Sequence, residues 1–271
     1  MKKNEKYAVG FLGYGRMAQA ISEGLNRCGL IPYTRQAASD LKGGEWLKLA
    51  EERGFHPAPG NRPLVTLCPL VIVAVKPHQV RPVLEEVRPA APGRLFISIA
   101  AGLKLADLQA WLPKTAGLIR VMPNLPALAG QGLTLICAPP EAPPSHLEQA
   151  RVIFQAVGDV LELEETKFEV GMAVSGSGPA YFFLFMDALI RGAVRLGLTW
   201  ETARQLVLGT ALGSAVVARA RPDLNLAALR DQVTSPGGAT AEALQVMEQG
   251  GLTGLMATAL EAAAEKGRRL G

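Results

Sequence analysis

Hydroxyl side chains, a proline and a pair of glycines are gathered at residues 233–240. The residues that follow, 241–248, carry apolar side chains at helical spacing and predict a helix. The first N–H groups of a helix and the positive end of its dipole attract an anion, and glycines let that anion approach the backbone. The stretch therefore favours an anion site. The alternative is an ordinary turn in which Ser235 or Thr240 caps the helix.

A second glycine-rich turn occurs near the start of the chain. Residues 7–12 are apolar and predict a short strand, and the pattern G-x-G-x-x-A follows at Gly13, Gly15 and Ala18, where a helical pattern opens. Gly13 permits a tight turn, Gly15 lets the backbone approach a pyrophosphate, and Ala18 allows close packing of helix on strand. In this context the motif favours dinucleotide binding over a purely structural turn.

The second predicted strand, residues 35–39, bears on which nicotinamide cofactor is used. Its carboxyl end places Ser39 and Asp40 near the adenosine ribose. An acid there usually binds the ribose hydroxyl of NAD, whereas a 2′-phosphate prefers hydroxyls and cations. Ser39 with Lys42 nearby allows a phosphate and Asp40 argues against it, so these residues leave NAD and NADP open.

Further strands alternate with helices along the first half of the chain. Continuous apolar runs at 70–75, 95–100 and 118–122 predict strands buried on both faces, and helical patterns lie between them. The alternation predicts a parallel, doubly wound α/β sheet of Rossmann type. Residues 133–137 and 159–163 predict two more strands. His78 follows a strand end, but we expect a surface or helix-start residue there.

After Glu165 the strands stop, and the rest of the chain predicts helices. We therefore expect a dinucleotide-binding domain at 1–164 and an all-α domain at 165–271. Residues 181–186 and 205–217 are apolar on every side, and a small helical domain has little interior to cover such helices. This predicts self-association through the second domain. The predicted helices lie at 181–196, 200–220, 226–232, 239–249 and 252–269.

Composition narrows the classes of protein further. The chain has 271 residues, 49% hydrophobic and 19% charged, as in a globular protein. The net charge is +4, but the positive residues are scattered and aromatics are sparse, so we expect no nucleic acid partner. Three cysteines without paired spacing predict no disulfide framework and no metal site, and favour the cytoplasm. We also expect no signal peptide and no apolar run long enough to span a bilayer.

Several of these segments resemble the pyrroline-5-carboxylate reductase family. The most specific are residues 175–180 and 233–240, and the resemblance runs almost end to end. It implies a Rossmann domain followed by a helical dimerisation domain, with five dimers able to associate as a decamer. Asn61 lies where the family contacts the ribose phosphate, which places NADPH above NADH, although NADH remains possible. The region 221–229 is longer than the family pattern. The implied cofactor-binding residues are Gly13, Gly15, Arg16, Met17, Ala18, Ser39, Asn61, Ala74, Val75, Lys76, Pro77, Ala100, Ala101, Gly102 and Asn124.

The resemblance implies reduction of 1-pyrroline-5-carboxylate to L-proline with a nicotinamide cofactor. The implied substrate-binding residues are Ser177, Ser235, Gly237, Gly238 and Thr240, with the Thr240 hydroxyl reaching the ring nitrogen as the catalytic group. Two rivals remain. A β-hydroxyacid dehydrogenase would need a general base, usually a lysine early in the second domain. Lys167 is the only lysine in residues 166–200. A non-enzymatic NADP-binding regulator would need no such group.

Overall fold

The computed structural model describes residues 6–40 and 45–269, which form two compact units. The first unit contains the chain up to Ser177 together with the residues from Ala262 onward, and the second contains Gly178–Glu261. The predicted boundary at 164/165 falls earlier in the chain than the division between these units. The first helix after the sheet and the last turns of the chain therefore both belong to the first unit.

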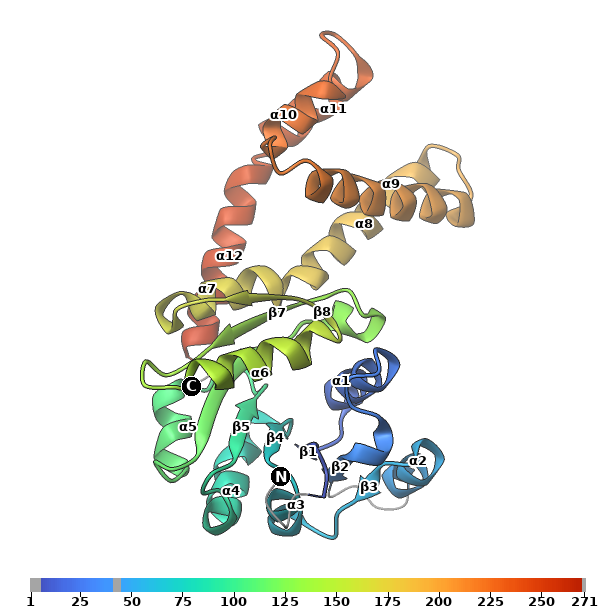
Figure 1. The fold of residues 1–271 in the computed structure, drawn as a ribbon. Coiled ribbons are helices and arrows are strands. Elements are labelled where there is room, and N and C mark those ends of the chain that lie inside the picture. Colours follow the sequence, from blue (N-terminus) through green and yellow to red (C-terminus); the bar gives the residue numbers. More distant parts are fainter. Residues whose placement is uncertain (1–5, 41–44, 270–271) are drawn as a thin grey trace. The chain divides into compact units, whose positions relative to one another are not determined.

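A single sheet organises the first unit (Figure 1). Its described strands lie in the order β3-β2-β1-β4-β5-β6-β7-β8, and β1 pairs in parallel with both β2 and β4. The order reverses between β1 and β4, which is the switch point where doubly wound sheets bind ligands. The strands are β1 (Val9–Leu12), β2 (Gln36–Ser39), β3 (His56–Pro57), β4 (Leu70–Val73), β5 (Leu95–Ser98), β6 (Gly117–Met122), β7 (Gly132–Cys137) and β8 (Gly158–Glu162).

The sheet departs from the predicted parallel arrangement at one edge. β7 runs antiparallel to β6, and β8 then pairs in parallel with β7. The connection from β6 to β7 is a short 3₁₀ segment, Leu125–Ala129, rather than a crossover helix. A short connection returns the chain in the opposite direction, because parallel neighbours need a longer crossover. The Rossmann-type α/β prediction is confirmed, with this reversed edge as a correction.

Helices cover both faces of the sheet. One face packs against α3 (Asn61–Leu67), α4 (Pro77–Val87), α5 (Leu105–Trp111) and α7 (Glu165–Ser175). The other packs against α1 (Arg16–Arg27), α2 (Glu45–Arg53) and α6 (Pro144–Gln155). β1, β4 and β5 are buried along their whole length, as continuous apolar runs predict, and β2 is buried as well although it contains Gln36 and Ser39. Neither β3, which has two residues, nor α3, which has seven, was predicted from the sequence.

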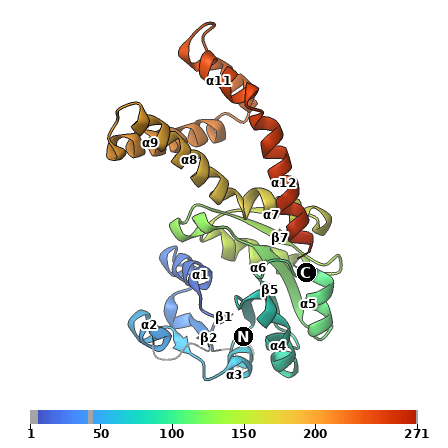
Figure 2. The same ribbon diagram turned by 180° about the vertical axis from the view of Figure 1, so that it is seen from behind.

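The second unit, Gly178–Glu261, consists of helices and the loops that connect them. Within it α8 and α9 lie side by side in both views (Figures 1 and 2). α12 begins in this unit, and its last turns belong to the first, where Gly267 lies against Met172 of α7. A Cβ on Gly267 would come within 2.8 Å of the Met172 Cε atom, so a larger residue there would require the Met172 side chain to shift. The helices are α8 (Gly178–Arg195), α9 (Trp200–Ala220), α10 (Leu226–Gln232), α11 (Ala239–Gln249) and α12 (Leu252–Arg268).

Candidate functional site

The predicted cofactor residues lie at the carboxyl ends of neighbouring strands. Gly13 follows β1, Ser39 ends β2, and the segments 74–77, 100–102 and 123–124 follow β4, β5 and β6. In the spatial order of the sheet they form a row along one edge. Dinucleotides bind in the crevice beyond these strand ends. The fold thus brings together residues that are far apart in the sequence.

The glycine turn after β1 is held in place by its own chain. Gly13 has φ +85°, and a Cβ there would lie 2.9 Å from the Val75 Cγ1 atom and 3.1 Å from the Ala74 backbone. The Tyr14 N–H donates to Asp40 Oδ2 at 2.7 Å. The sequence predicted Asp40 near the ribose, with a cap on the helix at 45–53 as the alternative, and in the structure its carboxylate also fixes the turn. Substitution at Asp40 will therefore alter the shape of the turn as well as the local charge.

Tyr14 anchors the same turn to the sheet, a role that the motif alone did not indicate. Its hydroxyl donates to Ser22 Oγ at 2.6 Å, and Ser22 donates to Gln36 Oε1 at 2.6 Å. Burial raises the pKa of the Tyr14 phenol, and the Ser22 hydrogen bond opposes this rise only in part. The phenol therefore stays protonated and acts as a donor.

The N-terminus of α1 fits a pyrophosphate. Gly15 is the N-cap, and no side chain caps the helix or places an acid in its first turn. A Cβ added to Gly15 would meet nothing within 4 Å, so the space beside this backbone is open. Arg16 begins the helix with an exposed side chain. Uncapped N–H groups, the helix dipole and a nearby cation together favour a phosphate group.

Three residues from three elements form a hydrogen-bond chain at the carboxyl end of β2. Ser39 Oγ donates to Asn61 Oδ1 at 2.9 Å, and Asn61 Nδ2 donates to Glu86 Oε2 at 2.7 Å. The structure thus joins Ser39 and Asn61, the two residues predicted at the ribose, and adds Glu86 of α4. Sequence spacing gave no signal for Glu86. Lys42 lies outside the described residues.

The segments predicted to lie near the nicotinamide differ in exposure. After β4, Ala74 and Val75 are partly buried, while Lys76 and Pro77 are exposed at the start of α4. The Lys76 N–H donates to Gln79 Oε1 at 3.2 Å, which fixes the beginning of that helix. After β5, Ala100 and Gly102 are buried and Ala101 is partly buried. Gly102 has φ +82°, a conformation that glycine adopts at little cost.

Asn124, also predicted to bind the cofactor, makes two structural hydrogen bonds. Its Oδ1 accepts the Leu133 N–H at 2.9 Å, and its Nδ2 donates to the Ser175 carbonyl at 3.0 Å. The side chain is buried. It therefore fixes the start of β7 and the end of α7, and its side chain retains one amide proton and one lone pair of Oδ1 for a ligand.

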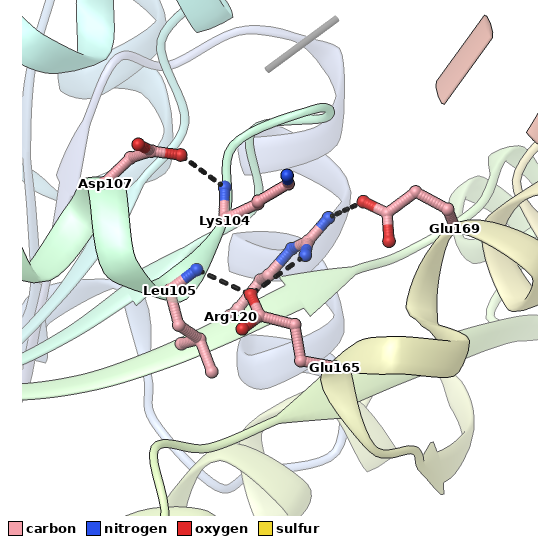
Figure 3. A network of polar contacts seen from close by, with 6 residues as sticks. All are labelled: Lys104, Leu105, Asp107, Arg120, Glu165 and Glu169. Atoms are coloured by element: carbon pink, nitrogen blue, oxygen red, sulfur yellow. Dashed lines mark hydrogen bonds and ion pairs between the residues drawn. The ribbon is translucent and has the colours of Figure 1, made fainter. Parts of the chain in front are cut away.

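A buried ion network ties the sheet to α7 (Figure 3). Arg120 of β6 has 2% of its side chain exposed and pairs with Glu169 at 2.7 Å and with Glu165 at 3.2 Å. Its guanidinium lies 4.2 Å from the centroid of the Phe168 ring. Glu165 also accepts the Leu105 N–H at 2.6 Å, at the first residue of α5. One carboxylate thus joins α5, β6 and α7 just beyond the segment 100–102.

The predicted anion site at 233–240 lies at the start of α11 in the second unit. Gly237 has φ +67°, Gly238 is the N-cap, and no side chain caps the helix. Ser235 and Thr240 are exposed, and Thr240 lies inside the first turn rather than at the cap. The alternative of an ordinary side-chain cap is therefore wrong. Ser177, the fifth predicted substrate residue, is partly buried at the end of the first unit.

Comparison with known proteins identifies the family. Residues 165–270 match the family model for pyrroline-5-carboxylate reductase dimerisation, and residues 8–102 match that for coenzyme F420-dependent NADP oxidoreductases. The pyrroline-5-carboxylate reductase of Pseudomonas aeruginosa is 38% identical, over 97% of this chain and 96% of the relative. The chain belongs to the pyrroline-5-carboxylate reductase family. Its relatives include the pea enzyme, 33% identical over 98% of this chain and 97% of the relative.

Solved structures agree with this assignment. The reductase of Coxiella burnetii has a TM-score of 0.91 and 36% identity, covering 98% of this chain and 99% of that one. The Plasmodium falciparum reductase, with NADP bound, has a TM-score of 0.89 and 30% identity, again covering 98% and 99%. The predicted fold, family and NAD(P)H-dependent oxidoreductase activity are confirmed.

The exposed apolar side chains of the second unit lie within the family's dimerisation region. Phe182, Leu184 and Leu212 are 68%, 71% and 69% exposed in the single chain. The helical stretch Glu165–Arg195 is long and apolar enough to cross a membrane, judged by length and composition alone. In the single chain, 22% of its most apolar window is buried. The prediction that no apolar run reaches this length is therefore wrong, because α7 and α8 follow each other almost without interruption. The match to a dimerisation region accounts for these apolar surfaces by association of subunits.

Proposed function

We propose that this chain reduces 1-pyrroline-5-carboxylate to L-proline with NADPH, and that it accepts NADH less well. The observation that carries this proposal is the 38% identity to a pyrroline-5-carboxylate reductase over 97% of the chain, which spans both the cofactor and the dimerisation regions. Asn61 lies beside Ser39 at the end of β2, at the position where the family resemblance implies contact with the ribose phosphate, and this position supports the use of NADPH. The Plasmodium falciparum relative with bound NADP supports it as well.

The first unit would hold and orient the cofactor. Backbone N–H groups at Gly15 and the first turn of α1 would bind the pyrophosphate, with Arg16 adding positive charge. Segments 74–77 and 100–102 would line the nicotinamide side. When bound, the cofactor supplies a hydride for the carbon of a C=N bond. The chain's own contribution is to orient the reactants and exclude water.

The start of α11 would hold the substrate. Backbone N–H groups at Gly237 and Gly238, with the Ser235 hydroxyl, suit the carboxylate of the substrate. The Thr240 hydroxyl would hydrogen-bond the ring nitrogen as the catalytic group, and Ser177 is proposed as a further substrate-binding residue. Residues 233–240 contain no His, Asp or Glu. This suits an imine that brings its own proton, because its iminium form already accepts hydride at carbon.

A β-hydroxyacid dehydrogenase is less well supported. That reaction requires a base positioned to take a hydroxyl proton. Lys167 is the only lysine in α7 and α8, and it is exposed and paired with Glu164 at 3.3 Å. A lysine held in an exposed ion pair is not positioned to take a proton from a bound substrate.

The family's dimerisation region indicates homo-oligomers, and we propose a decamer of five dimers in the cytoplasm. The apolar side chains of α8 and α9 would form the dimer interface. Light scattering at low micromolar concentration would test the assembly. A stable monomer would refute association, and a dimer would refute the decamer alone.

The activity is tested by steady-state turnover of the purified chain. We expect NADPH oxidation that depends on 1-pyrroline-5-carboxylate and yields one proline per NADPH. The same preparation should show no NADP⁺ reduction with a panel of β-hydroxyacids. NADPH binding without turnover of the imine would favour a regulator and refute the proposal.

A further inference from the structure

The hydrogen-bond chain Ser39–Asn61–Glu86 has a direction that its chemistry fixes. A carboxylate can only accept hydrogen bonds, so Glu86 requires the amide nitrogen of Asn61 to face it. The amide oxygen of Asn61 then faces Ser39 and accepts the proton of the Ser39 hydroxyl. The assignment of the Asn61 amide therefore follows from Glu86. In this order the Ser39 oxygen offers only lone pairs to a ligand.

That order matters because of where Ser39 lies. Ser39 is the last residue of β2 and pairs with Leu12 of β1, directly before the glycine turn. The adenosine ribose of a dinucleotide lies beyond this strand end. A ribose 2′-hydroxyl can donate to the Ser39 lone pairs, whereas a 2′-phosphate accepts and needs a donor. The charge of Glu86, one side chain away from Ser39, also opposes a phosphate.

We propose that Glu86 is a specificity-determining residue for the nicotinamide cofactor. By accepting the Asn61 amide proton, it keeps the Asn61 oxygen bonded to the Ser39 hydroxyl, so that Ser39 presents only an acceptor to the ribose. This weakens the preference for NADPH, whose 2′-phosphate needs a donor. This inference rests on the proposed use of a nicotinamide dinucleotide. On this inference, Glu86 is the reason why the chain accepts NADH as well as NADPH. Asp40 carries an acid at the same strand end, but its carboxylate also holds the Tyr14 N–H, so Glu86 is the cleaner position to test.

The replacement Glu86→Gln should reverse the chain. The Gln amide can donate to Asn61 Oδ1, Asn61 can then donate to Ser39 Oγ, and the Ser39 proton becomes available to a phosphate oxygen. We expect the ratio of NADH to NADPH dissociation constants to rise about three- to tenfold, the value of one hydrogen bond. Glu86→Ala removes the charge but supplies no donor, so its ratio should rise less than that of Glu86→Gln.

A neighbouring glutamate provides the matched control. Glu85 lies on the same helix and is also exposed, but it pairs with Arg81 at 2.9 Å. Glu85→Gln removes the same charge and should leave the ratio unchanged, so it separates the network from a general change in surface charge. Helix content and melting temperature of all three variants should match the parent, because these side chains are on the surface.

The experiment is titration of the full-length chain and its variants with NADPH and with NADH, followed by nucleotide fluorescence, with no imine substrate present. A rise in the ratio of NADH to NADPH dissociation constants that is largest in Glu86→Gln supports the inference. An unchanged ratio overturns it, and an equal rise in Glu86→Ala or in Glu85→Gln overturns the role of proton order. If neither nucleotide binds, both the inference and the proposed function fail. If both bind and only the ratio stays fixed, the proposed function stands and the inference alone fails.

Discussion

Two glycine-rich turns open helices in this chain, and they are built differently. The turn at Gly13–Gly15 is held by Tyr14, by Asp40 and by close contact with the segment after β4. The turn at 235–238 is exposed, and a Cβ on Gly237 would meet nothing within 4 Å. Both helices that follow lack a side-chain cap. Contacts within the first unit preorganise the first turn, whereas the second turn makes few contacts within the second unit.

The difference extends to the units that carry the turns. The first unit has two large apolar clusters and a buried ion network around Arg120. The second exposes Phe182, Phe183 and Leu184 along one stretch of α8. Because apolar surface of this kind is usually covered by association, the second turn belongs to a unit that we expect to be completed by a partner subunit. Substitutions in the two units should therefore separate cofactor binding and folding from substrate turnover.

Arg120→Ala should have the largest effect on stability. It leaves Glu169 buried without its partner, and breaking a buried pair in this way costs about 3–5 kcal/mol. We expect the urea midpoint to fall by the corresponding amount, measured at fixed protein concentration because the chain associates. Arg191→Ala provides the control, since its pair with Asp187 is exposed and should contribute under about 1 kcal/mol. Equal losses in the two variants would show that the buried network is not a special anchor.

Gly13→Ala should be the next most damaging change. The residue would adopt a left-handed conformation and would crowd Val75, and we expect a loss of about 2–4 kcal/mol. Thermal and urea unfolding would measure the loss. Retention of full stability and of NADPH binding would mean that the turn is not preorganised as described.

Gly15→Ala sharpens the contrast within the same turn. The new methyl group meets no protein atom, so the free energy of unfolding should stay within about 0.5 kcal/mol of the parent. The methyl group would occupy the space where the pyrophosphate approaches the backbone, and NADPH affinity should fall about tenfold or more. Fluorescence titration measures this affinity. A variant that binds NADPH as tightly as the parent would remove Gly15 from the cofactor site.

Thr240→Ala tests the role of the second turn in substrate turnover. Thr240 is exposed and caps nothing, so the melting temperature and the NADPH dissociation constant should stay unchanged. Loss of a hydrogen bond to the substrate should lower kcat/KM for 1-pyrroline-5-carboxylate about tenfold. Thr240→Ser should recover most of the activity because it keeps the hydroxyl. Full activity in Thr240→Ala would remove its catalytic assignment.

Local signals in the sequence predicted much of this structure. Helical periodicity predicted α9, α10 and α11 at their observed bounds. The glycine motif predicted the first turn because Gly13 adopts a left-handed conformation against the segment after β4 and Gly15 leaves open space beside the backbone. β3 has only two residues and so no periodicity to detect, and the apolar pattern of β7 does not indicate that the strand runs antiparallel to β6.

Side-chain partners between distant elements escaped prediction for a different reason. Arg120 pairs with Glu169 across 49 positions, and Asn61 bonds Glu86 across 25. No local pattern encodes such a pair, because it forms only once two elements pack together. The same limit applies to Asp40, whose bond to Tyr14 depends on the alignment of β1 with β2.

Transfer of label from the cofactor tests the proposed chemistry most directly. The full-length chain would be supplied with 1-pyrroline-5-carboxylate and NADPH deuterated at the transferable position of nicotinamide C4, and the product analysed by mass spectrometry and NMR. We expect proline with one deuterium on the ring carbon that was the imine carbon. Unlabelled proline, or no proline while NADPH still binds, would contradict direct hydride transfer to the imine.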